Sequence, residues 1–219
     1  VRGIDVSKWQ GNIDWNAVKK SGVTFAIIRA GNRYGSSGTI AEDPYFEYNF
    51  KSALHAGIKV GVYFYSQAIS EKEAIEEANQ TLSLIKKYRA EYEAEYGKKE
   101  DLTYPIFIDT EYLDGGRANA LTAEARTACV KAFCKKVEAA GYEAGVYANK
   151  DWFIHNLYAG ELNDYCIWVA QYPKNYTEGM KSTYNGPHRI WQYTSSGVVS
   201  GISGRVDMNI CYQDFIKYD

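Results

Sequence analysis

The strongest constraint on the fold is a pattern that occurs three times along the chain. In each copy a helical segment ends at a glycine, and an apolar, strand-like run follows at once. The copies are VKKSGVTFAIIRAG (18–31), ALHAGIKVGVYFYS (53–66) and EAAGYEAGVYANK (138–150), and their glycines are Gly22, Gly57 and Gly141. Glycine in this place suits the left-handed C-cap of a helix. Helices that feed directly into apolar strands, repeated in this way, indicate alternating α and β elements around a parallel sheet.

The rest of the chain extends this alternation. Five strand-like runs are expected at 2–6, 23–30, 59–66, 104–111 and 143–149. Each precedes a helical pattern, and these patterns are expected at 14–22, at 43–56, from Ser70 onward, at 122–140 and within 151–163. Ser70 and Glu73 have the spacing of a capping box. Three more strand-like runs follow with little room for helices between them, at 166–172, 189–195 and 205–211.

This order of elements predicts an α/β fold with five βα units followed by three strands that have few or no helices. Eight strands can close a barrel whose centre is filled by side chains. No linker rich in Pro or Ser interrupts residues 1–219. We therefore expect one domain over the whole chain, a single TIM-like barrel.

Composition excludes several classes of partner. The formal net charge of −2 gives no electrostatic attraction to nucleic acid. No apolar run approaches the roughly 18 residues of a membrane span. The chain opens with strand-like VRGIDVSKWQ and no signal peptide, so we interpret it as cytoplasmic, mature or cut from a longer protein.

The cysteines and histidines show no metal-binding pattern. The four cysteines, at 129, 134, 166 and 211, form no C-x-x-C pair, and the three histidines show no pairing. We interpret the cysteines as small packing residues and expect neither a cofactor nor a metal.

A second constraint is the stretch TYPIFIDTEYLD (103–114), a strand-like run that ends in two acids. Because side chains alternate along a strand, Asp109 and Glu111 should share one face with Phe107. Both faces of such a strand are buried in a parallel barrel, which explains its apolar character. Sites of these barrels are built at the C-terminal strand ends, where both acids stand. The alternative is an exposed strand end with two solvated charges.

Other polar and aromatic residues are expected at the same end of the barrel. Asp5 stands near the end of the first strand and Asp207 in the last, and barrel closure should bring them together. We interpret Arg29 either as an internal counter-charge to the acids or as a surface residue. The 20 Tyr, 5 Trp and 8 Phe suit either a core or a cleft that stacks flat ligand faces. Candidates for such a cleft are Tyr63, Tyr147, Tyr172 and Trp191.

The two acids of the fourth strand are close enough to tune each other. Two residues along a strand span ~6.6 Å, and charges ~7 Å apart interact by ~2.4 kcal/mol at an effective dielectric constant of ~20. An interaction of this size raises the pKa of a glutamic acid from ~4.3 to ~6. An ionised Asp109 could therefore keep Glu111 protonated near neutral pH, as a general acid for glycosidic cleavage must be.

Seven segments of the chain form a set: GIDVSKWQGNIDW, AIIRAG, GVYFYS, PIFIDTEYLD, GVYANKDWF, IWVAQY and IWQYTSSGVVSGISGRVDMNICY. In this order, over nearly the whole chain, they resemble the family 25 glycoside hydrolases, the Chalaropsis-type lysozymes of bacteria, phages and fungi. The resemblance implies a flattened barrel of five βα units plus three strands. It also implies a lysozyme (1,4-β-N-acetylmuramidase), which hydrolyses the β-1,4 bond between N-acetylmuramic acid and N-acetylglucosamine in peptidoglycan.

Carried over by position, the resemblance assigns roles to the candidate residues. Glu111 matches the catalytic acid and Asp109 the second catalytic carboxylate, while Asp5 and Asp207 match two further acids of the family's cleft. Arg29 stands where members of the family often have a lysine. The substrate-binding residues that we expect are Arg29, Tyr63, Tyr147, Tyr172 and Trp191.

Alternatives stay open for the mechanism and for the activity. Carboxyl separations of ~5–5.5 Å suit retention and ~6.5–9.5 Å inversion. An aspartate two residues before the acid also suits substrate assistance, in which the N-acetyl group of the sugar attacks and Asp109 orients it; we favour this hypothesis. A chitinase-like endo-N-acetylglucosaminidase is one alternative activity, although Phe107 replaces the first acid of its D-x-D-x-E pattern. A barrel that binds cell-wall glycan without cleaving it is another.

The implied substrate also bears on partners and location. Peptidoglycan lies outside the membrane, so we expect an extracellular or cell-wall-associated protein whose signal peptide is removed or lies outside this chain. We expect a monomer with no nucleic-acid partner, no membrane insertion, no cofactor and no metal. A metal site built from Asp5, Asp109 and Glu111 is the alternative.

Overall fold

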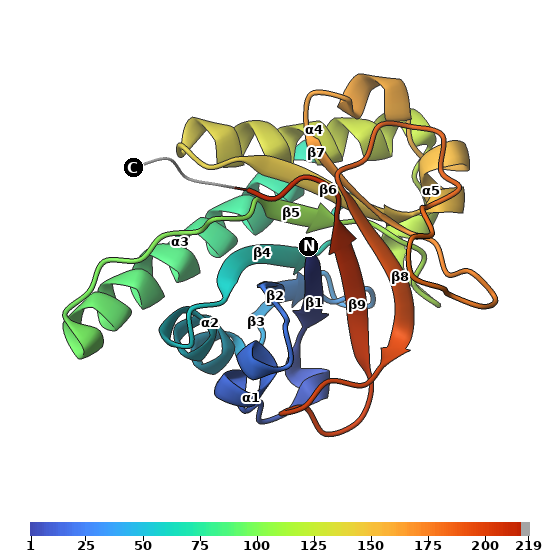
Figure 1. Cartoon of the computed structure of the whole chain (residues 1–219). Helices are drawn as coiled ribbons and strands as arrows, with labels where there is room; N and C mark the ends of the chain where they lie inside the picture. The colour runs from blue at the N-terminus through green and yellow to red at the C-terminus, as the bar shows by residue number, and fades with distance from the viewer. Residues whose placement is uncertain (216–219) are drawn as a thin grey trace.

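The computed structural model describes residues 1–215 and shows a closed barrel with helices packed on its outside (Figure 1). Within this range the barrel strands are β1 (Arg2–Val6), β2 (Phe25–Arg33), β4 (Lys59–Tyr65), β5 (Ile106–Asp109), β6 (Ala144–Asn149), β7 (Cys166–Ala170), β8 (Ile190–Gly197) and β9 (Val206–Cys211). The α-helices are α1 (Trp15–Lys20), α2 (Phe46–His55), α3 (Glu71–Tyr96), α4 (Ala123–Ala139) and α5 (Lys150–His155). Three short 3-10 helices in the same range are η1 (Lys8–Gln10), η2 (Arg117–Ala120) and η3 (Ala159–Leu162). None of the described helices is both long and apolar enough to cross a membrane.

The expected barrel is confirmed, with a correction to the direction of its last strand. β1 pairs in parallel with β2, and parallel pairing continues from β2 through β4, β5, β6 and β7 to β8. β9 closes the barrel by pairing antiparallel with both β8 and β1. The β8–β9 connection, residues 198–205, is shorter than the crossover of about a dozen residues that a parallel pair requires. The barrel is therefore mixed.

The order of elements also matches the prediction of five βα units followed by three strands. A further short strand, β3 (Ile40–Glu42), pairs antiparallel with the end of β2 and was not predicted. Its three residues are too few to show a period of two. β5 is shorter than the expected 104–111, so Glu111 lies beyond the end of the strand.

Local signals explain where several helices begin and end. The three glycines of the repeated pattern have φ values of 87°, 73° and 87°, as the left-handed C-cap position requires. At the start of α3 the Ser70 hydroxyl accepts a hydrogen bond from the Glu73 amide (3.3 Å). The Glu73 carboxylate accepts from the Ile69 amide (2.9 Å) and not from Ser70, so the predicted capping box is only half formed.

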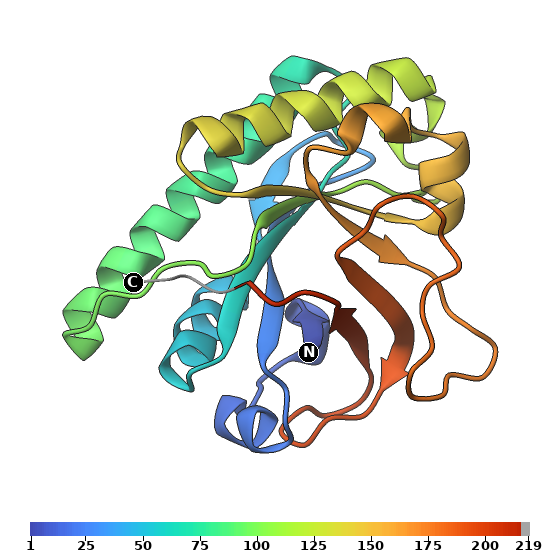
Figure 2. The same ribbon diagram turned by 45° about the horizontal axis from the view of Figure 1, so that its top comes forward.

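Apolar side chains fill two layers. The outer layer lies between the strands and the helices, and Figure 2 shows α3 and α4 side by side on the part of the barrel away from β8 and β9. The inner layer contains the rings of Phe25, Tyr63, Phe107, Tyr147 and Trp168. Glycine makes room for one of these rings, because a Cβ at Gly145 would lie 2.3 Å from Phe107. The rings fill the barrel centre, which leaves its mouth as the place for a site.

Candidate active site

The C-terminal ends of the parallel strands surround a hollow of about 440 Å³. Four carboxylates line it: Asp5 from β1, Asp109 from β5, Glu111 just beyond β5 and Asp207 from β9. The structure thus brings together the four acids that the sequence places at strand ends. Asp207 reaches the mouth from the first half of β9, because this strand runs against the others.

Asp5 and Asp207 are direct partners in the β1–β9 pair, as barrel closure led us to expect. Asp5 is buried, and its Oδ2 accepts hydrogen bonds from Gln192 Nε2 and Asn209 Nδ2, both at 2.8 Å. Burial raises the pKa of Asp5 well above its ordinary range, and the charge of Asp207 adds to this. Burial also raises the pKa of Asp207. The pair therefore holds protons more tightly than two solvated aspartates would.

Asp109 is buried at the end of β5, 4 % exposed. Burial raises its pKa well above the ordinary range; the charges of Glu111 and Asp5 add to this, and that of Arg29 opposes it. Within residues 1–215 its Oδ1 is buried without a hydrogen-bond partner. Such an oxygen at a ligand-sized hollow can accept a hydrogen bond from a bound molecule.

Glu111 is only partly buried and lies at the edge of the hollow. Burial, followed by the charge of Asp207, raises its pKa to about 7. The value fits the expectation of a glutamic acid protonated near neutral pH, but its source differs. The expected cause was the charge of an ionised Asp109, whereas burial is the main cause and Asp207 supplies the neighbouring charge.

Arg29 lines the hollow, but its ion-pair partner is not one of the four acids. Both Nε and Nη2 lie 2.7 Å from Asp43 Oδ2, in the segment between β3 and α2. Arg29 is therefore buried and not a surface residue, but its direct ion pair is with Asp43 and not with a cleft acid. Its positive charge still lowers the pKa of Asp109 from nearby.

Three of the four predicted cleft aromatics lie at the mouth. Tyr63 and Tyr147 line the hollow, and both rings pack on Trp168, with centroids 6.1 and 4.4 Å away. Tyr172 is about half exposed, and its hydroxyl donates to Gln192 Oε1 (2.6 Å). Tyr147 donates to the same oxygen (2.9 Å). Gln192 therefore accepts hydrogen bonds from two of the tyrosines at the barrel mouth, Tyr147 and Tyr172.

The fourth, Trp191, is not in the cleft. Its side chain is buried in the outer layer, and its Nε1 donates to the Gln171 carbonyl (2.7 Å). The neighbouring Gln192 takes the inward position on β8 instead. Ile190–Tyr193 of this strand are all buried, so burial does not reveal which of them point inward.

Three residues that line or brace the hollow were not predicted from the sequence. Trp168 forms part of its floor and donates from Nε1 to Asn209 Oδ1 (2.8 Å). Asn209 and Gln192 bond Asp5, as described above. Strand alternation could have identified Asn209, because it lies two residues after Asp207 and so on the same face.

A second hollow of about 510 Å³ shares Glu111 and Tyr147 with the first. Trp152 and Tyr172 line this second hollow. On the rim of the first, Trp9 is 76 % exposed. The two hollows together form a groove across the barrel mouth, and Glu111 lies where they meet.

Another hollow, of about 690 Å³, lies beside α1 and α2. The carboxylate on its wall belongs to Asp14, which caps α1 by accepting from the Ala17 amide (3.0 Å). Glycosidic cleavage with two acids needs a pair of carboxylates. The groove at the barrel mouth is therefore the candidate active site.

The arrangement of acids in the groove suits acid-catalysed cleavage of a sugar chain. A carboxyl with a pKa of about 7 can donate a proton near neutral pH, and a second carboxyl stands beside it. Among residues 1–215 no group of three or more His, Cys, Asp or Glu side chains is arranged to hold a metal ion, so the alternative of a metal bound by Asp5, Asp109 and Glu111 has no support in the described structure.

Comparisons with curated proteins agree with this chemistry. Lysozyme M1 of Streptomyces globisporus is 28 % identical over 218 residues, which cover 95 % of this chain and 67 % of that protein. The autolytic lysozyme of Clostridium acetobutylicum is 27 % identical over 209 residues, covering 95 % of this chain and 55 % of the relative.

Solved structures show the same fold. The modular autolysin LytC of Streptococcus pneumoniae, in complex with a synthetic peptidoglycan ligand, matches with a TM-score of 0.78 and 29 % identity, covering 96 % of this chain but only 46 % of LytC. A lysozyme of Streptomyces coelicolor matches with a TM-score of 0.73 and 26 % identity, covering 98 % and 93 % of the two chains. The family model for glycosyl hydrolases family 25 matches residues 4–202. This match spans most of the barrel and three of its four acids, Asp5, Asp109 and Glu111, and we conclude that the chain belongs to glycosyl hydrolase family 25.

Proposed function

We propose that this domain is a lysozyme (1,4-β-N-acetylmuramidase) that hydrolyses the β-1,4 bond between N-acetylmuramic acid and N-acetylglucosamine in peptidoglycan. The family, the lysozymes among its relatives and the peptidoglycan ligand of LytC support this substrate. The observation that carries the proposal is the place of Glu111. Its carboxyl, with a pKa of about 7, lies where two hollows meet and beside a second buried acid.

In the proposed mechanism Glu111 is the general acid. It donates its proton to the glycosidic oxygen as the bond to the anomeric carbon breaks, and the leaving sugar departs as an alcohol. Asp109 acts as the second carboxylate. The N-acetyl group of the retained sugar supplies its carbonyl oxygen to the anomeric carbon, and Asp109 orients this group by accepting from its N–H. The unpartnered Oδ1 of Asp109 supports this role.

The second half of the reaction releases the product. Glu111, now a carboxylate, removes a proton from a water molecule, which attacks the anomeric carbon and returns the carbonyl oxygen to the N-acetyl group. Two displacements at one carbon give net retention. Nuclear magnetic resonance of the first product should therefore show the retained anomer, and an inverted anomer would exclude substrate assistance.

The other groove residues have supporting roles in this proposal. Asp207 raises the pKa of Glu111, and Asp5 raises the pKa of Asp109. The aromatic faces of Tyr63, Tyr147 and Tyr172 bind the sugar rings. All these groups come from one chain, so the proposal needs no second copy. Because its substrate is the cell wall, the domain would act outside the membrane.

Digestion of purified bacterial walls tests the proposal. We expect a suspension of walls to lose turbidity, and mass analysis should find N-acetylmuramic acid at the new reducing ends. Glu111→Gln should abolish both, while Asp114→Asn, which changes an exposed acid on the same loop, should not. N-acetylglucosamine ends together with turnover of chitin oligomers would identify the chitinase-like alternative. Binding to walls without clearing would identify a glycan-binding barrel.

A further inference from the structure

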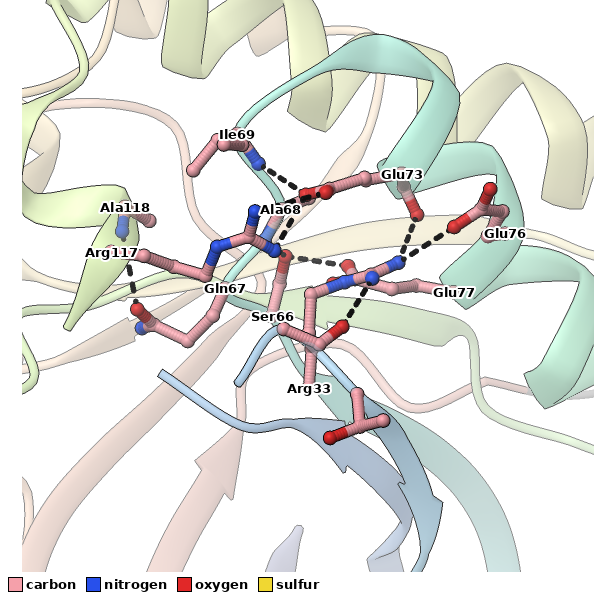
Figure 3. Close-up of polar contacts among 12 residues, drawn as sticks. Arg33, Ser66, Gln67, Ala68, Ile69, Glu73, Glu76, Glu77, Arg117 and Ala118 are labelled. Atoms are coloured by element: carbon pink, nitrogen blue, oxygen red, sulfur yellow. Dashed lines mark hydrogen bonds and ion pairs between the residues drawn. The ribbon is translucent and has the colours of Figure 1, made fainter. Parts of the chain in front are cut away.

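Two arginines and three glutamates form a network at the N-terminal end of α3 (Figure 3). The network adjoins the hollow lined by the four acids, the acid hollow, because Arg33 also lines it. The glutamates are Glu73, Glu76 and Glu77 in the first turns of α3. Arg33 is the last residue of β2, before the β2–β3 loop, and Arg117 is the first residue of η2, in the segment after β5. Both side chains pair with these glutamates. The proposed chemistry uses none of these residues directly.

Arg33 is buried and makes the first set of contacts in the network. Its Nε donates to Glu77 Oε1 (2.8 Å), Nη1 to the Gly38 carbonyl (2.7 Å) and Nη2 to the Glu73 carbonyl (3.0 Å). Glu77 is fully buried and also accepts from Ser66 Oγ (2.6 Å). The loop between β2 and β3 is thereby fixed to α3.

Arg117 makes the second set of contacts, with Glu73. Its Nη1 and Nη2 donate to the two carboxylate oxygens of Glu73, both at 3.0 Å. The two side chains are 24 % and 21 % exposed, and a paired fork of this kind fixes orientation as well as distance. One residue further, the Ala118 amide donates to Gln67 Oε1 (3.3 Å). The segment that follows β5 is thereby fixed to the same end of α3.

The segment between Glu111 and Arg117 is itself braced. The Asn119 side chain bonds the backbone of Leu113 twice, with Nδ2 donating to the Leu113 carbonyl (2.6 Å) and Oδ1 accepting from its amide (3.3 Å). A Cβ at Gly116 would lie 2.8 Å from Leu113 Cβ, so the turn is tightly packed. If Arg117 moved, the backbone from Leu113 to Arg117 would therefore move with it, and the position of Glu111 would change.

Both loops held by the network form a wall of the acid hollow. Tyr34 and Gly35 lie on the first, and Glu111 and Leu113 on the second. A Cβ at Gly35 would lie 2.7 Å from Leu113 Cδ2, so the loops touch. The Glu111 carboxylate makes no hydrogen bond or ion pair with the rest of residues 1–215. The position of the Glu111 carboxylate therefore depends on the backbone of residues 110–113.

We propose that Arg117 and Glu73 are positioning residues for Glu111: their ion pair fixes the segment after β5 against α3 and so holds the Glu111 carboxyl half-shielded over the groove. This inference rests on the proposed role of Glu111 as the general acid. A looser segment would misplace the acid relative to the glycosidic oxygen. It would also expose the acid to water and remove part of the burial that raises its pKa.

The test replaces Arg117 by methionine, which keeps the aliphatic stem and removes the fork. Arg117→Met should lower kcat for wall digestion roughly ten- to hundred-fold and change KM much less, because the acid and not the groove is displaced. The alkaline limb of the pH–rate profile should move to lower pH, and amide exchange of residues 112–119 should be faster. Arg117→Lys keeps the charge but not the fork, and should recover part of kcat.

Lys131→Met is the matched control, because it removes a surface ion pair with Glu161 (2.8 Å) between α4 and η3. It should leave the pH–rate profile and the exchange of residues 112–119 unchanged. An inactive wild type would refute the proposed function and the positioning role with it. An active wild type whose Arg117→Met variant keeps kcat and the alkaline limb, even at a lower melting temperature, would refute the positioning role alone.

Discussion

The raised pKa of Glu111 predicts that the proposed catalytic acid destabilises the folded protein above neutral pH. The folded pKa is about 7 against an ordinary value of 4.5, so the folded protein holds this proton more tightly than the unfolded chain does. The stabilising contribution is fully present below the unfolded value and is lost as the pH rises through about 7. Glu111→Gln, which cannot ionise, should therefore gain stability relative to the wild type as the pH rises.

The size of the gain follows from the two pKa values. Their difference corresponds to at most ~3.4 kcal/mol at about pH 8. Glu111 is only partly buried, and water screens part of this effect, so we expect ~2 kcal/mol. The substitution also removes the negative charge of Glu111 from beside Asp109, and this further increases the stability of the variant. For a chain of this length, ~2 kcal/mol raises the melting temperature by roughly 4–8 °C.

Calorimetry at about pH 4.5 and about pH 8 measures this difference. The melting temperature of Glu111→Gln relative to the wild type should be higher at the alkaline pH by the stated amount. Any packing cost of the amide is present at both pH values and cancels. Asp114→Asn is the control, because Asp114 is an exposed acid on the same loop. It measures the effect of a carboxyl-to-amide change outside the groove. An equal change at both pH values for Glu111→Gln would contradict the assignment of a raised pKa to this residue.

Three further predictions concern the groove and the core. Asp207→Asn removes a charge that raises the pKa of Glu111, so the alkaline limb of the pH–rate profile should move to lower pH; an unmoved limb would leave burial as the only cause. Gly145→Ala places a Cβ 2.3 Å from the Phe107 ring and should destabilise the fold by ~1–3 kcal/mol in chemical denaturation, and an unchanged midpoint would show that the ring can move aside. Trp9→Ala removes an exposed ring from the groove rim and should raise KM for walls roughly three- to ten-fold at unchanged melting temperature, unless this ring takes no part in binding.

Most of the barrel was predictable because its local signals agree with one another. Glycine C-caps end the helices directly before apolar strands, and this fixes the alternation. The reversal of β9 was also accessible, because eight residues between β8 and β9 leave no room for a crossover. β3 was not, since three residues carry no periodic signal and its pairing with β2 depends on the folded loop.

The site was predictable where alternation along a strand decides the direction of a side chain. Asp5 and Asp207 follow from barrel closure. The prediction for Trp191 was wrong because Ile190–Tyr193 of β8 are all buried, so that burial does not distinguish the face toward the cleft from the face toward the outer layer. The pairing of Arg29 with Asp43 depends on how the β3–α2 segment returns to the mouth, which no local pattern encodes.

The antiparallel pairing of β9 with β1 has a consequence for synthesis on the ribosome. Within this domain β1 is synthesised before β9, and the edge of β1 that pairs with β9 stays uncovered until β9 has been made. The docking of β9 delivers Asp207 beside Asp5, so the barrel and its acid cluster are completed together. A nascent chain that stops before Val206 would lack the closing strand and Asp207, so its barrel would stay open and Glu111 would lack the neighbouring charge that raises its pKa.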